Sequence, residues 1–134
     1  MVQIAQWDQR AGPLLEDTLP NRVLLHQNAR TLLVESKPVA AMGVWPIWQG
    51  VGRAWAVLSG DALRYPVMLT RGARGFLHEI EARDGYRRIE ATIERGHDRG
   101  RRWALRLGFV YEATLQSYGP TGIDHDLYVH LGGR

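Results

Sequence analysis

Hydrophobic and polar residues alternate along several stretches of the chain, and a period of two is typical of a β-strand. The clearest case is the segment 86–94, where apolar and charged positions alternate and predict a strand with one buried face. Turn signals at Lys37-Pro38 and Gln49-Gly50 favour an antiparallel meander in the first half of the chain. The remaining apolar or alternating stretches predict strands over residues 2–7, 31–36, 39–47, 52–59, 109–118 and 123–131.

Other stretches have the helical period. Residues 8–30 show it with breaks at Pro13 and Pro20. A long helix is expected to begin at Asp61 or just after it, with Pro66 in its first turn, and to end at 84–85. Its buried stripe would consist of Leu69, Ala73, Phe76, Leu77 and Ile80.

Two glycines, Gly72 and Gly75, lie inside this long helix. Each costs about 1 kcal/mol relative to alanine. We therefore expect them to allow a close approach of the helix to the sheet or to a ligand.

A second, shorter helix is predicted after the strand at 86–94. Asp98 is its expected N-cap, and Gly108 is expected to follow its last turn in a left-handed conformation. Trp103 and Leu107 share one face of this helix. The opposite face carries Arg99, Arg102 and Arg106.

The predicted order is strand, helices, three strands, helix, strand, helix and hairpin. This order indicates an α/β (α+β) fold, with a single mixed sheet of about six to seven strands covered by helices on both faces. The chain has 134 residues, of which 45% are hydrophobic, so one domain over residues 1–134 is expected.

The composition narrows the possible chemistry. The chain contains no cysteine, which excludes a disulfide, a thiolate metal site and a cysteine nucleophile. The longest apolar run, 39–47, is interrupted by Gly43 and Pro46 and is far shorter than the ~20 residues of a membrane helix. No secretory signal opens the chain. These features predict a protein without a membrane partner, in the cytoplasm of a bacterium or of a phage-infected host cell, or in a virion.

Positive charge is concentrated in the second half. The net charge is +3, but between Arg71 and Arg106 ten arginines face six acidic residues. Three interpretations stay open: a solvated and partly ion-paired surface, a site for a phosphate-bearing ligand, and a nucleic-acid interface.

One stretch, RRWALRLGFVYEA at 101–113, carries a family resemblance. A helix runs there into Leu107-Gly108-Phe109, and the strand that follows contains Glu112. This pattern, with the order of elements, resembles the GNAT (GCN5-related N-acetyltransferase) superfamily. The segment 50–63 looks further like a phage-encoded branch of small GNAT-like proteins.

The resemblance implies a GNAT fold that holds acetyl-CoA or a related acyl-CoA in a V-shaped gap between two strands. The implied activity is N-acyl transfer to an amine of a small molecule or a protein. In this sequence one of the two strands would end near Ser59, and the other would carry Ile93. The implied cofactor-binding residues are Leu58, Ser59, Gly60, Arg64, Arg99, Arg101 and Arg102.

Two features depart from the family pattern. The loop that precedes the long helix has a single glycine, Gly60, and an acidic residue, Asp61, where the family has a glycine-rich phosphate loop. Ala104 stands where many members have a proton-donating tyrosine, and residues 53–59 contain no acidic base. His97 and Asp98 are therefore the preferred catalytic candidates, although His97 could simply precede the helix cap.

The other histidines and acidic residues give weaker signals. His125, between two aspartates, is a second candidate base. It is five residues from His130, which predicts opposite faces of one strand and no shared metal ion, so no metal is expected. Glu90 and Glu94 are about 13 Å apart along their strand, so ion pairs with Arg88 or its neighbours are expected rather than a carboxylate pair.

Other functions remain possible at this stage. The missing tyrosine and glycine-rich loop favour a non-catalytic phage virion or host-interaction protein that keeps the fold. Nucleic-acid binding by the arginine-rich segment is a third hypothesis. The run 45–48, Trp-Pro-Ile-Trp, is predicted to form an exposed rim for a partner or substrate, and a second copy of the chain could bury it in a homodimer.

Overall fold

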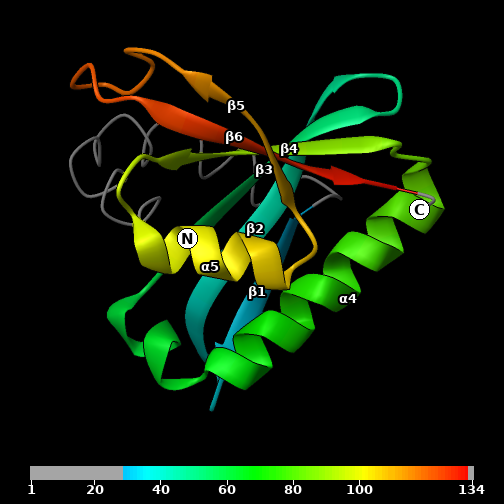
Figure 1. Ribbon diagram of the computed structural model, residues 1–134. Helices are drawn as coiled ribbons and strands as arrows, with labels where there is room; N and C mark the ends of the chain where they lie inside the picture. Colours follow the sequence, from blue (N-terminus) through cyan, green and yellow to red (C-terminus); the bar gives the residue numbers. More distant parts are fainter. Residues whose placement is uncertain (1–28, 133–134) are drawn as a thin grey trace.

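A computed structural model describes residues 29–132, and its centre is a six-stranded mixed sheet (Figure 1). The spatial order of the strands is β1-β2-β3-β4-β6-β5. Their bounds are β1 (Ala29–Val34), β2 (Lys37–Trp48), β3 (Val51–Leu58), β4 (Arg88–Glu94), β5 (Val110–Leu115) and β6 (His125–Leu131). The predicted α/β fold with a mixed sheet is confirmed, and each strand expected after residue 30 is present within a few residues of its predicted bounds.

Part of the prediction concerns residues outside this range. The strand expected at 2–7 and the helices expected between residues 8 and 28 lie outside the described residues. Ala29 and Arg30, which the helical pattern includes, belong instead to β1.

One pair of neighbouring strands separates along its length. β3 and β4 run parallel, and all other neighbouring strands are antiparallel. The β3–β4 pairing has only three rungs, from Val51–Arg88 to Arg53–Glu90. Beyond these rungs β3 continues to Leu58 and β4 continues to Glu94 without pairing to each other. β6 is the strand that pairs with β4 along its full length. The expected divergence of these two strands is confirmed.

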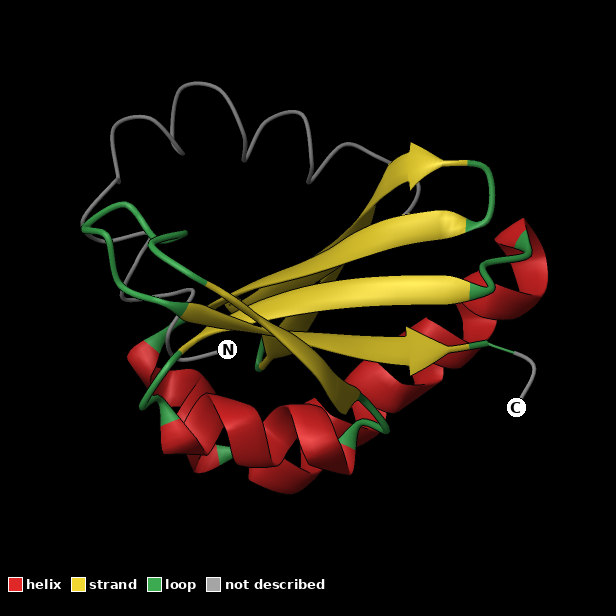
Figure 2. Ribbon diagram, turned by 45° about the horizontal axis from the view of Figure 1, so that its top comes forward, coloured by secondary structure: helices red, strands yellow, loops and turns green. Residues whose placement is uncertain are grey.

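Both α-helices of the described residues pack on the same face of the sheet (Figure 2). These are α4 (Pro66–Asp84) and α5 (Asp98–Arg106), and the short 3-10 helix η1 (Gly60–Arg64) precedes α4. The five residues of the predicted α4 stripe are all buried, which confirms it. Four of them meet Ile89 and Ile93 of β4 and Tyr128 of β6 in the main core, whereas Leu69 packs in a second cluster with Leu58 and Ala62. Neither helix combines the length and apolar composition needed to cross a bilayer.

The start of the long helix differs from the expectation. Residues 60–64 form the tighter η1, and the chain then breaks at Tyr65 before α4 begins at Pro66. Proline favours the first helical position because its missing N–H has no intrahelical acceptor there. At the other end Gly85 adopts φ 68°, so the predicted stop at 84–85 is confirmed.

Gly72 and Gly75 do not have the role expected of them. A methyl group built at either position would find no atom within 4 Å, and both residues are exposed. The expected close approach of the helix to the sheet is therefore wrong. These glycines leave the helix with a higher backbone entropy cost on folding and make no compensating contact.

This arrangement predicts that Gly72→Ala and Gly75→Ala each stabilise the protein by about 0.5–1 kcal/mol, because alanine lowers the entropy cost of forming α4. Urea unfolding followed by circular dichroism measures the change. Gly85→Ala is the matched control, and it should destabilise by about 1 kcal/mol because Gly85 has a left-handed conformation. A loss of stability in both helix-interior variants would contradict the prediction.

Candidate functional site

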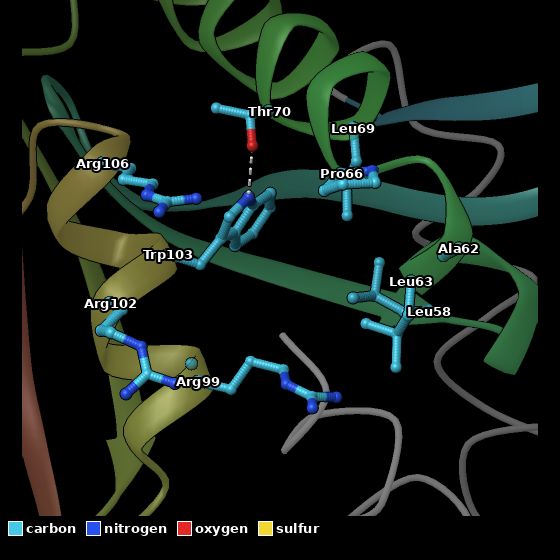
Figure 3. A pocket seen from close by; sticks show the side chains of 11 residues that line it. Leu58, Ala62, Leu63, Pro66, Leu69, Thr70, Arg99, Arg102, Trp103 and Arg106 are labelled. Carbon is cyan, nitrogen blue, oxygen red and sulfur yellow. Dashed lines mark hydrogen bonds between the residues drawn. The ribbon is translucent and has the colours of Figure 1, made fainter.

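A pocket of about 420 Å³ lies between α5 and the segment formed by η1 and the start of α4 (Figure 3). One wall carries Arg99, Arg102 and Arg106, which are on one face of α5 because they are three and four residues apart. The opposite wall is apolar and consists of Leu58, Ala62, Leu63, Pro66 and Leu69. The pocket therefore offers guanidinium groups on one side and hydrocarbon on the other.

The two helices that border the pocket are linked by side-chain hydrogen bonds. Trp103 Nε1 of α5 donates to Thr70 Oγ1 of α4 at 3.0 Å, as Figure 3 shows. Arg74 Nε donates to the backbone carbonyl of Arg106 at 3.0 Å, which places a cation at the negative end of α5. The width of the pocket is thus fixed by contacts between α4 and α5.

The start of α5 is held by a histidine. His97 Nδ1 accepts a hydrogen bond from the backbone N–H of Gly100 at 2.9 Å, which makes His97 the N-cap. The expected cap, Asp98, is instead the first helical residue, with an exposed side chain 3.9 Å from Arg101. Burial lowers the pKa of His97, which keeps the ring neutral and Nδ1 able to accept. The prediction of Asp98 as the cap is wrong by one residue.

A smaller cavity of about 40 Å³ occupies the gap where β3 and β4 diverge. Ala54 and Trp55 of β3 line it, as do Ala91, Thr92 and Ile93 of β4. Trp103 lines both this cavity and the arginine pocket, so the two adjoin at that side chain. A cationic surface pocket and a largely apolar gap in the sheet therefore lie on the two sides of one side chain, Trp103.

Ala104 is one of the residues that line the gap, and it is buried. Its methyl group cannot donate a proton. Ala104, which stands where many members of the resembled family have a tyrosine, thus lies in the wall of the gap.

The structure brings together only part of the predicted site. Leu58, Arg99 and Arg102 line the arginine pocket. Ser59 and Gly60 lie in the chain directly between Leu58 and the rest of η1 but do not line it. Arg64 is exposed and 3.9 Å from Asp61, and neither Arg101, His97 nor Asp98 borders either cavity.

Some lining residues were not among the predicted cofactor-binding residues. Arg106 continues the Arg99–Arg102 face by one more helical turn, so its spacing was a usable signal. Thr70 and Leu63 gave no sequence signal, because their position depends on the tertiary contact between α4 and α5.

Charged residues cluster on the face of the sheet turned away from α4 and α5, which we call the far face. Arg53 Nη2 donates to Glu90 Oε1 at 3.0 Å and Arg53 Nη1 to Tyr118 Oη at 2.8 Å. Arg88 donates to Glu90 at 2.9 Å and to both carboxylate oxygens of Glu112 at 2.6 Å. Glu112 raises the pKa of Arg88, and Arg88 lowers that of Glu112. The predicted ion pairing of Glu90 is confirmed.

The two histidines of β6 face opposite ways, as predicted. His130 Nδ1 is 2.5 Å from Glu81 Oε1 of α4, whereas the His125 ring lies 5.4 Å from the Tyr118 ring on the far face. His125 is buried, and this burial lowers its pKa. Within residues 29–132 no group of three or more histidine or acidic side chains is placed to hold a metal ion.

Many arginines of the basic segment have acidic or carbonyl partners. Arg83 contacts Asp84, Arg95 lies 3.8 Å from Asp126, and Arg88 is paired as described above. A partly ion-paired surface, one of the three interpretations of the charge, thus accounts for much of this segment. The guanidinium groups of Arg99 and Arg102 have no such partner among the described residues, and both line the pocket together with Arg106.

The fold matches that of solved acetyltransferases. A GNAT-family acetyltransferase from Bacillus anthracis superposes with a TM-score of 0.66 at 16% identity, over 78% of this chain and 66% of its own. Ribosomal-protein-S5-alanine acetyltransferase from Vibrio fischeri superposes with a TM-score of 0.67 at 18% identity, over 95% of this chain and 71% of its own. The microcin C7 self-immunity acetyltransferase MccE, solved with acetyl-CoA and AMP, superposes with a TM-score of 0.70 at 15% identity, over 92% of this chain and 71% of its own.

These likenesses establish a GNAT-like fold. No protein-family model matches the chain, and no curated protein sequence does. The chain spans slightly less than two thirds of the Bacillus anthracis protein and about seven tenths of the other two.

The buried cap predicts a pH-dependent stability. Because the pKa of His97 is lower in the folded than in the unfolded chain, the unfolded chain binds more protons between the two pKa values. The contribution of His97 to the stability of the fold is present above the pKa of the unfolded chain, about 6.5, and is lost as the pH falls below that pKa. His97→Asn keeps an acceptor at the cap but does not titrate, so its unfolding free energy should fall less on acidification.

Urea unfolding at a series of pH values measures this difference. His125, whose pKa is also lowered, should leave a residual slope in the variant. Identical pH profiles for the wild type and His97→Asn would show that the cap is not the titrating group.

Proposed function

We propose that this protein binds acetyl-CoA or a related acyl-CoA and transfers the acyl group to a primary amine of a small molecule or protein. The observation that carries the proposal is that two sites adjoin. A cationic pocket on α5 adjoins, at Trp103, an apolar gap between two diverging parallel strands. The fold neighbours are acetyltransferases, and MccE was solved with acetyl-CoA, which supports the same ligand class.

The donors present suit a phosphate-bearing ligand. Arginine presents planar, charged N–H donors that match phosphate oxygens, and Arg99 and Arg102 have no carboxylate partner in the described residues. This chain therefore relies on side chains where the family relies on glycine-rich backbone amides. We propose Arg99, Arg102 and Arg106 as the phosphate-binding residues, with Leu58 as part of the apolar wall. Ser59, Gly60, Arg64 and Arg101, the other residues that the resemblance implies, do not line the pocket.

The gap provides a place for the reactive end of the ligand. An acyl-CoA supplies an acyl group activated as a thioester. The chain holds that region between β3 and β4 in an apolar cavity, and Trp103 closes it against the arginine pocket. Past Arg53 and Glu90 the backbone N–H and C=O groups of β3 and β4 that face each other are not hydrogen-bonded between the two strands. An extended ligand that contains amide groups can therefore pair with them.

Positioning is the main catalytic contribution that these residues can supply. The amine nitrogen bonds to the acyl carbon, the carbon–sulfur bond breaks, and the proton lost by nitrogen balances the thiolate that leaves. Ala104 cannot deliver that proton, and His97 uses Nδ1 as the cap acceptor away from both cavities. Holding two reactants in contact can lower a barrier by ~7–11 kcal/mol in favourable cases. A slow transferase is therefore consistent with the site.

A second candidate is a non-catalytic interaction protein that keeps the GNAT-like fold. The buried Ala104 in the gap wall favours it, as does the exposed run at 45–48, where Trp48 is 68% exposed. That exposure agrees with the predicted rim for a partner. A phage origin and a homodimer through this rim remain predictions, and detectable amine acylation would argue against the non-catalytic role.

Calorimetric titration with acetyl-CoA tests ligand binding directly. We expect saturable binding that weakens as salt rises, because the arginines act on phosphate charge. Incubation with an amine panel then tests the reaction through release of the free thiol. An absence of binding even at millimolar acetyl-CoA would remove both the ligand and the reaction.

Two variants test the arginine wall. Arg99→Ala and Arg102→Ala should each weaken acetyl-CoA binding by about 10-fold or more, since a charge-assisted hydrogen bond contributes roughly 1.5–3 kcal/mol. Arg71→Ala is the matched control, because Arg71 is an exposed arginine of α4 that does not line the pocket. Equal losses in all three variants would indicate a general charge effect and not a specific phosphate site.

A further inference from the structure

The Trp103 side chain separates the arginine pocket from the gap between β3 and β4. It lines both cavities, and no other residue of the described chain does so. Its ring is partly buried and packs against both hydrophobic clusters, the main core and the smaller cluster that contains Leu58 and Leu69. One side chain therefore forms the partition between two cavities that the proposed ligand has to occupy together.

The gap is too small for its ligand while the ring stays in place. The pocket measures about 420 Å³, whereas the gap measures about 40 Å³. A buried water molecule needs roughly 10–15 Å³ of such a cavity, so the gap has space for about three waters. The reactive end of an acyl-CoA, with its acyl group, its sulfur and the adjoining methylene groups, is larger than that. The ring therefore has to move before a ligand in the pocket can extend into the gap.

A single hydrogen bond holds the ring in its observed position. Trp103 Nε1 of α5 donates to Thr70 Oγ1 of α4 at 3.0 Å, and Figure 3 shows the indole between the two helices with its N–H toward Thr70. A hydrogen bond between neutral groups changes an equilibrium by about 2- to 10-fold. This bond is strong enough to favour one position of the ring and weak enough to be broken when a ligand binds.

The surroundings of Trp103 allow the ring to leave this position. The side chain of a helical residue lies over the preceding turn of its helix. In that turn Gly100, three residues before Trp103, contributes no side chain and lines the arginine pocket. The space beside the ring is therefore open on the side of the pocket.

The two helices stay connected when the ring moves. Arg74 Nε of α4 donates to the backbone carbonyl of Arg106 in α5 at 3.0 Å, and this bond does not involve the indole. Breaking the hydrogen bond between Trp103 and Thr70 therefore does not require α4 and α5 to separate.

We propose that Trp103 is a gate: its indole leaves Thr70 and moves into the arginine pocket, which joins the pocket to the gap and lets the acyl end of the ligand pass. The identity of the ligand rests on the proposed acyl-CoA binding, whereas the movement of the ring is a property of the chain alone. A gate that is mostly closed lowers the apparent affinity in proportion to its open fraction. Weakening the hydrogen bond to Thr70 should therefore strengthen binding.

Exchange of the Trp103 indole hydrogen with solvent tests the gate without any ligand. A proton–nitrogen NMR spectrum of the full chain resolves the indole N–H signals, and comparison with Trp103→Phe identifies the signal of Trp103. Thr70→Val removes the acceptor with little change in volume, so this hydrogen should exchange about 2- to 10-fold faster. Thr70→Ser keeps the hydroxyl group and should keep the exchange slow. Equal exchange rates in these two variants would overturn the gate.

Arg74→Ala is the matched control, because it removes the other hydrogen bond between α4 and α5 and leaves Thr70 in place. The Trp103 hydrogen should exchange in this variant at a rate close to that of the wild type. A rise as large as in Thr70→Val would show that the spacing of the helices controls access to the indole, and the gate would be refuted.

Acetyl-CoA then tests what the gate admits. In the ligand-free chain a nuclear Overhauser effect should connect the Trp103 indole N–H with Thr70, and it should disappear when acetyl-CoA saturates the protein. The dissociation constant of acetyl-CoA should fall by about 2- to 10-fold in Thr70→Val. Persistence of the Overhauser effect in the saturated complex, or weaker binding by Thr70→Val, would contradict the gate.

Failure of the gate and failure of the proposed function give different results. If neither the wild type nor Thr70→Val binds acetyl-CoA at millimolar concentration, but the exchange rates of Thr70→Val and Thr70→Ser differ as expected, the gate stands and the acyl-CoA function fails. If acetyl-CoA binds and those exchange rates are equal, the acyl-CoA function stands and the gate fails.

Discussion

The short parallel ladder between β3 and β4 is the constraint on which the site depends. Pairing ends at Arg53 and Glu90, and the ion pair between these residues lies at that last rung. Arg88 extends the connection by a two-pronged hydrogen bond to Glu112 of β5. Charged side chains therefore tie β3, β4 and β5 together at one end of the sheet. The opposite ends of β3 and β4 are free to separate, and the cavity at 54–55 and 91–93 is the result.

Chain connectivity then determines what borders the separated ends. β3 leads through η1 into α4, and β4 leads through Gly96 and His97 into α5, so each diverging strand delivers the start of a helix to the mouth of the gap. The arginine face of α5 and the apolar wall of η1 and α4 meet there for this reason. The hydrogen bond from Trp103 to Thr70 fixes their separation. A cationic pocket and an apolar gap become neighbours without any glycine-rich loop.

The sequence was most informative where a pattern reflects burial on a regular element. The alternation of Ile89, Ala91 and Ile93 and the stripe on α4 follow directly from core packing, and the structure confirms both. It was less informative where a local preference competes with a tertiary contact. Asp98 is the better N-cap by type, yet the partly buried His97 supplies the acceptor. Gly72 and Gly75 were expected to be packing sites, but neither touches a neighbour, and the helical period already places both beside the buried stripe and not within it. The pocket residues Leu63 and Thr70 depend on how α4 meets α5, which no single-strand or single-helix pattern encodes.

The two faces of the sheet divide the chemistry of the site. On the helix face, Arg99 and Arg102 can bind negative charge, and Ala104 stands in the gap wall where a tyrosine could have supplied a proton. On the far face, Glu90 and Tyr118 hold the Arg53 guanidinium, and the Trp55 ring lies over Gly43 of β2. Between these two groups of residues lies the opening where β3 and β4 diverge. Because that opening exists only past the last rung of the ladder, the Arg53–Glu90 pair determines where along the two strands it begins.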